Sequence, residues 1–162
     1  MATAQYWADL SVGDHFTTPP AAITRQEIFE FARNYDPQPY HLDEEAAADS
    51  VFGGLCASGW HVCAVMMRLL TDALASQQVS VLGVSEVEGL RWLKPVFAND
   101  QLTANITLAD KREGEQAAFG LAGFNLEIFN QRDERVITLH TELMIATSAA
   151  TRVDVVGTTH HE

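Results

Sequence analysis

Basic residues are scarce in this chain of 162 residues: Lys and Arg together number 10, against 22 Asp and Glu, for a formal net charge of −12 at pH 7. Such an acidic composition favours solubility and argues against a general surface for nucleic acids or anionic membranes. It leaves room for a local basic patch that would bind a phosphate-bearing ligand. We therefore expect no nucleic-acid partner and no membrane partner.

Cysteine is also rare, with Cys56 and Cys63 as its two occurrences. They stand seven positions apart in a helical pattern, which is too far for a disulfide within one helix. We interpret both as small core residues in a reducing compartment. Residues 1–10 have neither the basic cluster nor the apolar run of a signal peptide, and the most apolar region, residues 57–75, is interrupted by charged side chains. A cytoplasmic protein is the expectation.

Several functional signatures are missing as well. No group of His, Cys, Asp or Glu has metal-ligand spacing, and there is no phosphate-binding loop or dinucleotide fingerprint. We therefore expect neither a metal nor a cofactor. Repeats and linkers are absent too, so we predict one domain over residues 1–150. A polar, frayed tail over residues 151–162 should follow, with His160 and His161 inert.

The first half of the chain has helical patterns. Residues 24–27 (TRQE) form a capping box, and apolar side chains follow at helical spacing. They predict a helix of about three turns that ends at residue 34 or 35. Pro37 and Pro39 disfavour helix for the residues before them, so residues 36–40 are predicted to be stiff and non-helical.

A longer helix comes next, and the pattern then changes to strands. This helix is apolar on almost every side, which predicts burial, and it should begin after a glycine-rich turn at residues 52–59 and end near Ser76. One short strand at the start of the chain, broken by a turn at Gly13 and Asp14, and four long ones after the helix are predicted, over residues 10–16, 79–93, 101–111, 116–130 and 135–147. Because short turns join antiparallel neighbours, we predict an α+β fold in which a curved antiparallel sheet wraps around the buried helix.

Asp36 and His41 flank the stiff segment. A carboxylate and an imidazole are the usual pair for moving protons near neutral pH, and the two prolines between them would give such a site its rigidity. The same residues also fit an ordinary turn and a hydrogen-bonded surface histidine. Positions five apart in an extended chain point to opposite faces, so spacing alone does not bring the two side chains together.

Gly59 lies where the glycine-rich turn meets the buried helix. The amino end of a helix presents unpaired amides and a partial positive charge, which suits a thioester oxygen that gains negative charge. The alternative is that Gly53, Gly54 and Gly59 only permit tight turns and close packing. We interpret His61 as a hydrogen-bonded core histidine, with a polar partner in or near the site as the alternative, and assign His140 no role.

Two runs, residues 35–43 (YDPQPYHLD) and residues 52–61 (FGGLCASGWH), resemble the MaoC-like dehydratase family, which includes the (R)-specific enoyl-CoA hydratases. Residues 90–95 (LRWLKP) and residues 12–16 (VGDHF) extend the resemblance over nearly the whole chain. It implies the hot-dog fold, a sheet wrapped around a long helix. It also implies homodimers, with sheets joined edge to edge, or higher homo-oligomers.

The resemblance assigns roles to residues as well. It implies that Asp36 and His41 are catalytic and that the Gly59 backbone amide forms an oxyanion hole. Two positions depart from the family's pattern: Gln38 stands where asparagine is most frequent, and Ser58 where the best-known hydratases have histidine. These departures affect the inference of the substrate more than the inference of the reaction.

The implied activity is the reversible hydration of a trans-2-enoyl thioester of CoA or acyl carrier protein to the 3-hydroxyacyl thioester, with the (R) product. Asp36 and His41 would act on one water, and the Gly59 amide would stabilise the thioester oxygen. A hot-dog thioesterase and a non-catalytic acyl-thioester-binding subunit are the alternatives. The phosphates of CoA would need cations, and one group of four is worth naming, although solvated strand ends explain it better: Arg91, Lys94, Lys111 and Arg112.

Overall fold

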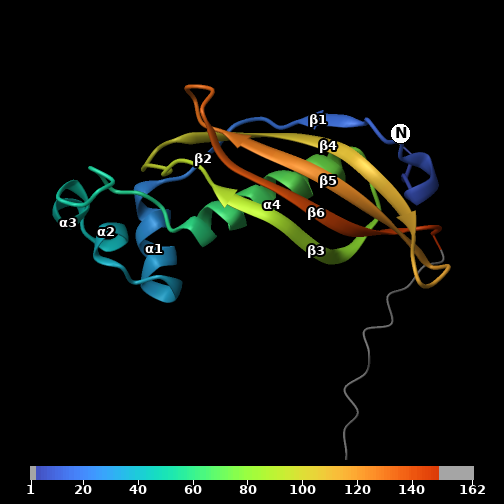
Figure 1. Cartoon of the computed structure of the whole chain (residues 1–162), viewed down its shortest axis with the longest axis horizontal. Helices are drawn as coiled ribbons and strands as arrows, with labels where there is room; N and C mark the ends of the chain where they lie inside the picture. Colours follow the sequence, from blue (N-terminus) through green and yellow to red (C-terminus); the bar gives the residue numbers. More distant parts are fainter. Residues whose placement is uncertain (1–2, 150–162) are drawn as a thin grey trace, which may run out of the picture.

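A long helix, α4 (Gly59–Ser76), lies across the concave face of a curved antiparallel sheet (Figure 1). The structure is a computed structural model that describes residues 3–149. The predicted tail, with His160 and His161, lies outside the described residues. None of the helices within the described range combines the length and the apolar character that a membrane span needs.

Four long strands form most of the sheet: β3 (Val81–Trp92), β4 (Gln101–Glu113), β5 (Phe119–Phe129) and β6 (Arg135–Ala146). The short strands β1 (His15–Thr17) and β2 (Ala21–Ala22) both pair with β4. The predicted α+β fold, with a sheet wrapped around one central helix, is confirmed.

The position of β3 differs from the order that a continuous series of hairpins would give. The strand order is β1-β4-β5-β6-β3, so β3 pairs with β6 and not with β4. Residues 93–100 connect β3 to β4 and therefore cross one end of the sheet. The prediction that consecutive strands are neighbours is wrong at this place, because a connection of this length does not force a hairpin as a two-residue turn does.

The start of the chain has the predicted turn at Gly13 and Asp14, but the strand is confined to the residues after it. After a 3₁₀ turn, η1 (Trp7–Asp9), the chain bends at Ser11 and Asp14, where the Asp14 carboxylate accepts from the Ser11 amide at 2.9 Å. Gly13 adopts a φ of 98° in this bend, a conformation that glycine tolerates. The bend shortens the predicted strand over residues 10–16 to β1.

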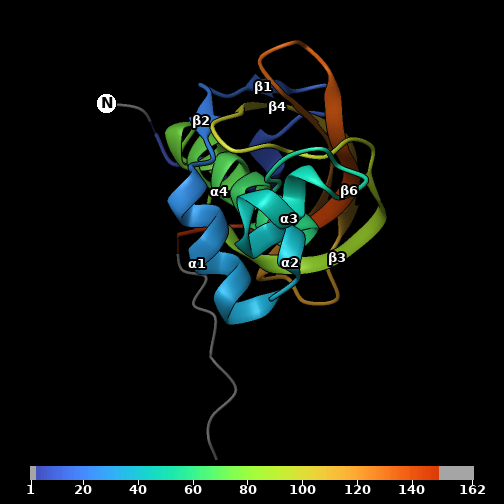
Figure 2. The same cartoon turned by 90° about the vertical axis from the view of Figure 1, so that its left-hand side faces the viewer.

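Three shorter helices gather at the end of the molecule where α4 begins (Figure 2). Helix α1 (Arg25–Tyr35) starts as predicted, because the Thr24 hydroxyl accepts from the Glu27 amide at 3.2 Å. Helix α3 (Glu44–Ala48) begins after Asp43, whose carboxylate accepts from the Ala46 amide at 2.8 Å. Between them, residues 36–38 are non-helical as predicted, but residues 39 and 40 belong to α2 (Pro39–Leu42). The prediction is wrong for these two residues, since proline is well tolerated at the first position of a helix.

One side of α4 forms the centre of the core. Leu70 and Leu74 are almost completely buried, together with apolar side chains of the sheet such as Ile106, Leu126 and Ile128. The opposite side carries the exposed Trp60 and an exposed ion pair between Arg68 and Asp72. Burial of α4 on every side was therefore a wrong expectation for the single chain.

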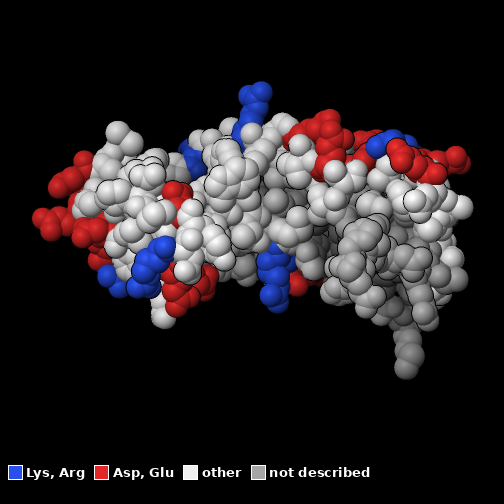
Figure 3. Space-filling view, turned by 90° about the horizontal axis from the view of Figure 1, so that it is seen from below, with Lys and Arg blue, Asp and Glu red and all other residues white. Residues whose placement is uncertain are grey.

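Charge is distributed unevenly over the surface. On the side that Figure 3 shows, acidic side chains form patches at the left end and along the upper right margin, and basic side chains are scattered between them. This is the side along which β3 runs in Figure 1. Three valines of β3 are exposed: Val81, Val84 and Val87.

Candidate active site

Asp36 and His41 meet at the amino end of α4. Asp36 ends α1 as its C-cap residue, and the single turn of α2 brings the chain back, so that His41 Nε2 lies 3.5 Å from Asp36 Oδ2. The His41 side chain is 7% exposed and that of Asp36 is 28% exposed. The helical turn supplies the convergence that an extended segment would have prevented.

The orientation of the His41 ring is set by its other nitrogen. Nδ1 lies 2.6 Å from the Cys56 carbonyl oxygen, and a carbonyl only accepts, so Nδ1 carries a hydrogen and donates it. In the neutral ring this leaves Nε2 with its lone pair facing Asp36. The arrangement gives His41 the form that a general base requires.

Ser58 is a site residue that sequence reasoning noted only as a departure from the family's pattern. Its hydroxyl, 1% exposed as a residue, donates a 2.6 Å hydrogen bond to Asp36 Oδ2, the same oxygen that faces His41. Ser58 is also the N-cap of α4, yet its side chain makes no capping bond to the helix. A serine before a long helix was the available signal, but it usually indicates a cap.

Gly59 is the first residue of α4, and its amide has no hydrogen-bond partner among residues 3–149. Because Ser58 donates to Asp36 instead of capping, the first turn of this helix keeps donors available for a ligand. Gly53, with a φ of 70°, serves the turn that precedes the helix. The structural explanation fits Gly53 through its φ, and it fits Gly59 as well, because a Cβ there would lie 2.8 Å from Trp92 Nε1. Gly59 differs in that it also has a free amide beside the Asp36–His41 pair.

Asp36, His41 and Gly59 line one cleft of about 450 Å³. This volume lies in the usual range for small-molecule sites, which are mainly apolar with a few convergent polar groups. The rest of the wall follows that pattern, because it is mostly aromatic and aliphatic: Tyr40, Phe52, Trp60, Val62, Trp92, Leu93, Pro95 and Val96.

His61 is not the hydrogen-bonded core histidine that we expected. Its ring is 7% exposed and stacks on Phe31, with centroids 4.8 Å apart, but Nδ1 has no hydrogen-bond partner in the described part of the chain. Burial lowers the pKa of His61, while the charge of Glu27 acts in the opposite direction. The ring is not part of the cleft wall.

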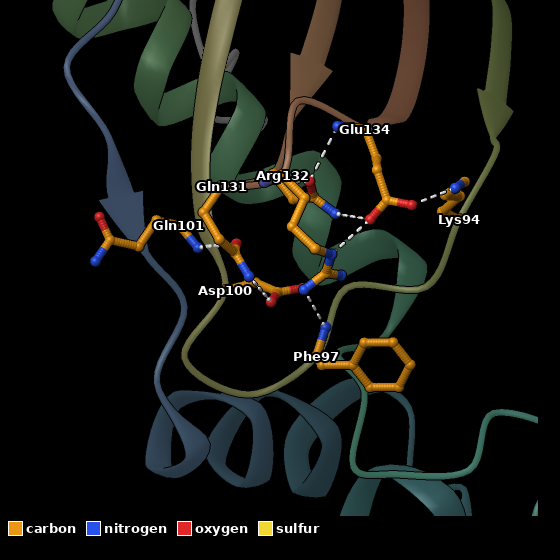
Figure 4. A network of polar contacts seen from close by, with 8 residues as sticks. Lys94, Phe97, Asp100, Gln101, Gln131, Arg132 and Glu134 are labelled. Atoms are coloured by element: carbon orange, nitrogen blue, oxygen red, sulfur yellow. Dashed lines mark hydrogen bonds and ion pairs between the residues drawn. The ribbon is translucent and has the colours of Figure 1, made fainter.

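The four cations that we grouped do not form a cluster. Lys94 lines the cleft and pairs with Glu134 in the turn between β5 and β6 (Figure 4). Lys111 and Arg112 lie toward the opposite end of the sheet, where Lys111 donates to the Leu10 carbonyl at 2.7 Å and Arg112 pairs with Glu142 at 2.8 Å. Lys94 therefore lies far along the sheet from Lys111 and Arg112.

The network in Figure 4 ties residues 93–100, of which residues 93–96 line the cleft, to the β5–β6 turn. Gln131 donates to Asp100 at 2.8 Å, and Asp100 in turn accepts from the Phe97 amide at 2.9 Å. Glu134 accepts from Lys94, Asn130 and Arg132, and these bonds lower its pKa to about 2. A charged Glu134 therefore helps to hold the cleft wall in place.

These features define a class: a helix enclosed by a curved sheet, with an Asp–His pair and free helix amides in one apolar cleft. The chain belongs to the MaoC-like domain family, whose model matches residues 9–126. The resemblance stated from the sequence is thereby confirmed.

Similar proteins agree with this assignment. The MaoC-like dehydratase of Rhodospirillum rubrum is 33% identical, with a TM-score of 0.77 over 90% of this chain and 99% of that one. The YdeM protein of Bacillus subtilis (strain 168) is 26% identical over 137 residues, which cover 85% of this chain and 96% of YdeM. The (R)-hydratase of A. caviae involved in PHA biosynthesis is 26% identical, with a TM-score of 0.65 over 83% of this chain and 96% of that one. The fold is the hot-dog fold, and the family is one of hydratases and dehydratases.

Proposed function

We propose that this chain is an enzyme that reversibly adds water to a trans-2-enoyl thioester and forms the 3-hydroxyacyl thioester. One observation carries the proposal: His41 Nε2 and Asp36 Oδ2 converge within 3.5 Å, in the apolar cleft that also contains the free Gly59 amide. A proton-transfer pair beside an anion-stabilising helix end is what hydration of a conjugated thioester requires.

In the proposed reaction, Asp36 and His41 hold one water between them. The pair removes a proton from this water as its oxygen forms a bond to C3, and a proton is delivered to C2. Charge that develops on the thioester oxygen is stabilised by the Gly59 amide at the positive end of α4. Ser58 positions Asp36 through the 2.6 Å hydrogen bond to Oδ2.

Known magnitudes show that these groups suffice for substantial catalysis. Positioned acid–base groups contribute about 10²–10⁴-fold. One oxyanion donor contributes about 10²–10³-fold in kcat. Both effects act here in a cleft with mainly apolar walls, where electrostatic interactions are stronger than in solution.

For the substrate, the apolar wall suits an acyl chain, and the carrier is CoA or acyl carrier protein. The (R) product follows by analogy with the A. caviae (R)-hydratase, which shares the fold. We place the carrier outside the cleft, beyond Lys94, because that residue stands in the wall and is half exposed.

We also propose that the active form is a homodimer joined through β3. Among residues 3–149, β3 pairs with β6 on one side and with no strand on the other, and Val84 and Val87 are 47% and 48% exposed along it. A long edge strand with exposed apolar side chains is normally covered.

The test of the activity follows the enoyl absorbance of crotonyl-CoA and of longer or branched analogues, with free thiol measured in parallel. Loss of absorbance without thiol release is the expected result, and Asp36→Asn or His41→Gln should reduce it by at least about 10²-fold. Thiol release alone would indicate a thioesterase, and no change with any chain length would contradict catalysis.

A second Asp–His pair provides the matched control. His140 Nε2 also lies 3.5 Å from a carboxylate oxygen, that of Asp110, but neither residue lines the cleft. Asp110→Asn and His140→Gln should therefore leave the rate unchanged. Equal losses in both pairs would show that the effect of the substitutions is structural.

A further inference from the structure

Trp92, the last residue of β3, lies against the first turn of α4. Its indole N–H donates a 2.9 Å hydrogen bond to the Gly59 carbonyl oxygen. Its ring also occupies the space that a side chain at position 59 would take, because a Cβ there would lie 2.8 Å from Trp92 Nε1. One side chain therefore holds residue 59 both by a hydrogen bond and by contact.

The same ring forms part of the cleft wall. Trp92 and Trp60 both line the cleft and meet edge to face, with ring centroids 5.2 Å apart. They are 45% and 61% exposed, respectively. Two exposed tryptophans at an apolar cleft offer contact area to a flat ligand group and lose little conformational entropy when they bind it.

The hydrogen bond bears on the free amide of Gly59. This amide belongs to the peptide before the Gly59 α-carbon, and the bonded carbonyl belongs to the peptide after it. Fixing the carbonyl limits rotation about this residue, and glycine has more freedom to rotate than any other residue. An oxyanion donor works only when it is held within hydrogen-bond distance of the developing charge.

We propose that Trp92 is a positioning residue for the hydration reaction and that, with Trp60, it forms the aromatic wall against which the enoyl thioester packs. The inference rests on the proposed function and deepens it. Trp92 fixes the direction of the Gly59 amide, and the paired rings hold the planar conjugated group of the substrate beside that amide.

Trp7 provides a matched control for a kinetic test. Its indole N–H donates to the Leu121 carbonyl at 2.9 Å, and its ring occupies the space beside Gly120, as Trp92 does beside Gly59. Trp7 does not line the cleft. Trp92→Phe is expected to lower kcat for crotonyl-CoA about 10-fold with less than about 3-fold change in KM, which is the loss expected for one positioning hydrogen bond. Trp7→Phe should leave both constants unchanged.

A binding experiment adds a readout that needs no turnover. Butyryl-CoA is saturated and cannot be hydrated, so its titration reports binding through tryptophan fluorescence. We expect it to quench the fluorescence of the wild-type protein and of Trp7→Phe, and to lose most of that quenching in Trp92→Phe. Circular dichroism and sedimentation of each variant establish that fold and assembly are unchanged.

The outcomes separate the two proposals. Three results would overturn the role of Trp92. These are wild-type kinetics in Trp92→Phe, an equal loss of kcat in Trp7→Phe, and a change of assembly without a change of kcat in Trp92→Phe. If crotonyl-CoA is hydrated but butyryl-CoA does not quench through Trp92, the aromatic wall is wrong and the proposed function stands. If butyryl-CoA quenches through Trp92 but no enoyl thioester is hydrated, the wall stands and the proposed function is wrong.

Discussion

Removal of the Ser58 hydroxyl tests whether this residue serves the helix or the site. Ser58→Ala deletes the 2.6 Å hydrogen bond to Asp36. It removes no hydrogen bond to α4, because the Ser58 side chain forms no capping bond. A hydrogen bond to a charged group contributes about 1.5–3 kcal/mol. If the bond holds Asp36 in the transition state, kcat/KM should fall about 10- to 150-fold, since about 1.4 kcal/mol corresponds to a factor of ten. The stability loss should be smaller, because Asp36 is 28% exposed and water can replace the lost donor.

Thr24→Ala is the control for Ser58→Ala, because it removes a hydroxyl that does cap a helix. The Thr24 hydroxyl is also at a helix N-cap, but it accepts from the Glu27 amide at 3.2 Å and so caps α1. Thr24→Ala should lower the free energy of unfolding by about 1 kcal/mol and leave kcat/KM unchanged. Urea denaturation and crotonyl-CoA kinetics on both variants provide the measurements. Wild-type kinetics in Ser58→Ala, or the same pattern of effects in both variants, would refute the reasoning.

Three further expectations concern the dimer, the pH dependence and the helix start. Val84→Lys should convert the dimer to a monomer in sedimentation experiments. Val12→Lys, at another exposed valine, should not. A monomeric wild-type protein would contradict the interface. Because the pKa of Glu134 falls from 4.5 to about 2 on folding, its contribution to stability is complete above pH 4.5 and is lost as the pH falls toward 2. Glu134→Gln should flatten the stability profile in that window, and an unchanged profile in acid denaturation would be the contrary result. Gly59→Ala should lower the melting temperature through its contact with Trp92 and be partly rescued by Trp92→Ala, while strictly additive effects would exclude that contact.

Local signals in the sequence account for most of the element boundaries. Thr24 starts α1 and Asp43 starts α3 through hydrogen bonds within the next three residues, so the residues concerned are adjacent in the sequence. The ends of β4, β5 and β6 follow in the same way from turns next to them. Such features could be predicted because the determining contacts are short in range.

Features that depend on distant contacts could not be predicted in the same way. The partner of β3 is chosen by the whole sheet, and residues 93–100 are compatible with either neighbour. The residue types of Asp36 and His41 suggested a proton-transfer pair, but the two side chains converge because of α2, which begins at Pro39 in a stretch that we predicted to be non-helical. The role of Ser58 was not predicted, because its partner is Asp36, at the end of another helix, and not an amide of its own helix.

The position of β3 also governs when the cleft can be completed as the chain folds. Val81 pairs with Ile145, and Trp92 pairs with Ile137, so the partner of β3 is the last strand that the structure describes. Contacts between such distant segments form late, because closing a long loop has a large entropic cost that local contacts do not carry. During synthesis from the N-terminus, α1, α2 and α4 can form early and bring Asp36, His41 and Gly59 near one another. The wall that Trp92 and the connection after it contribute has to wait until β6 has left the ribosome.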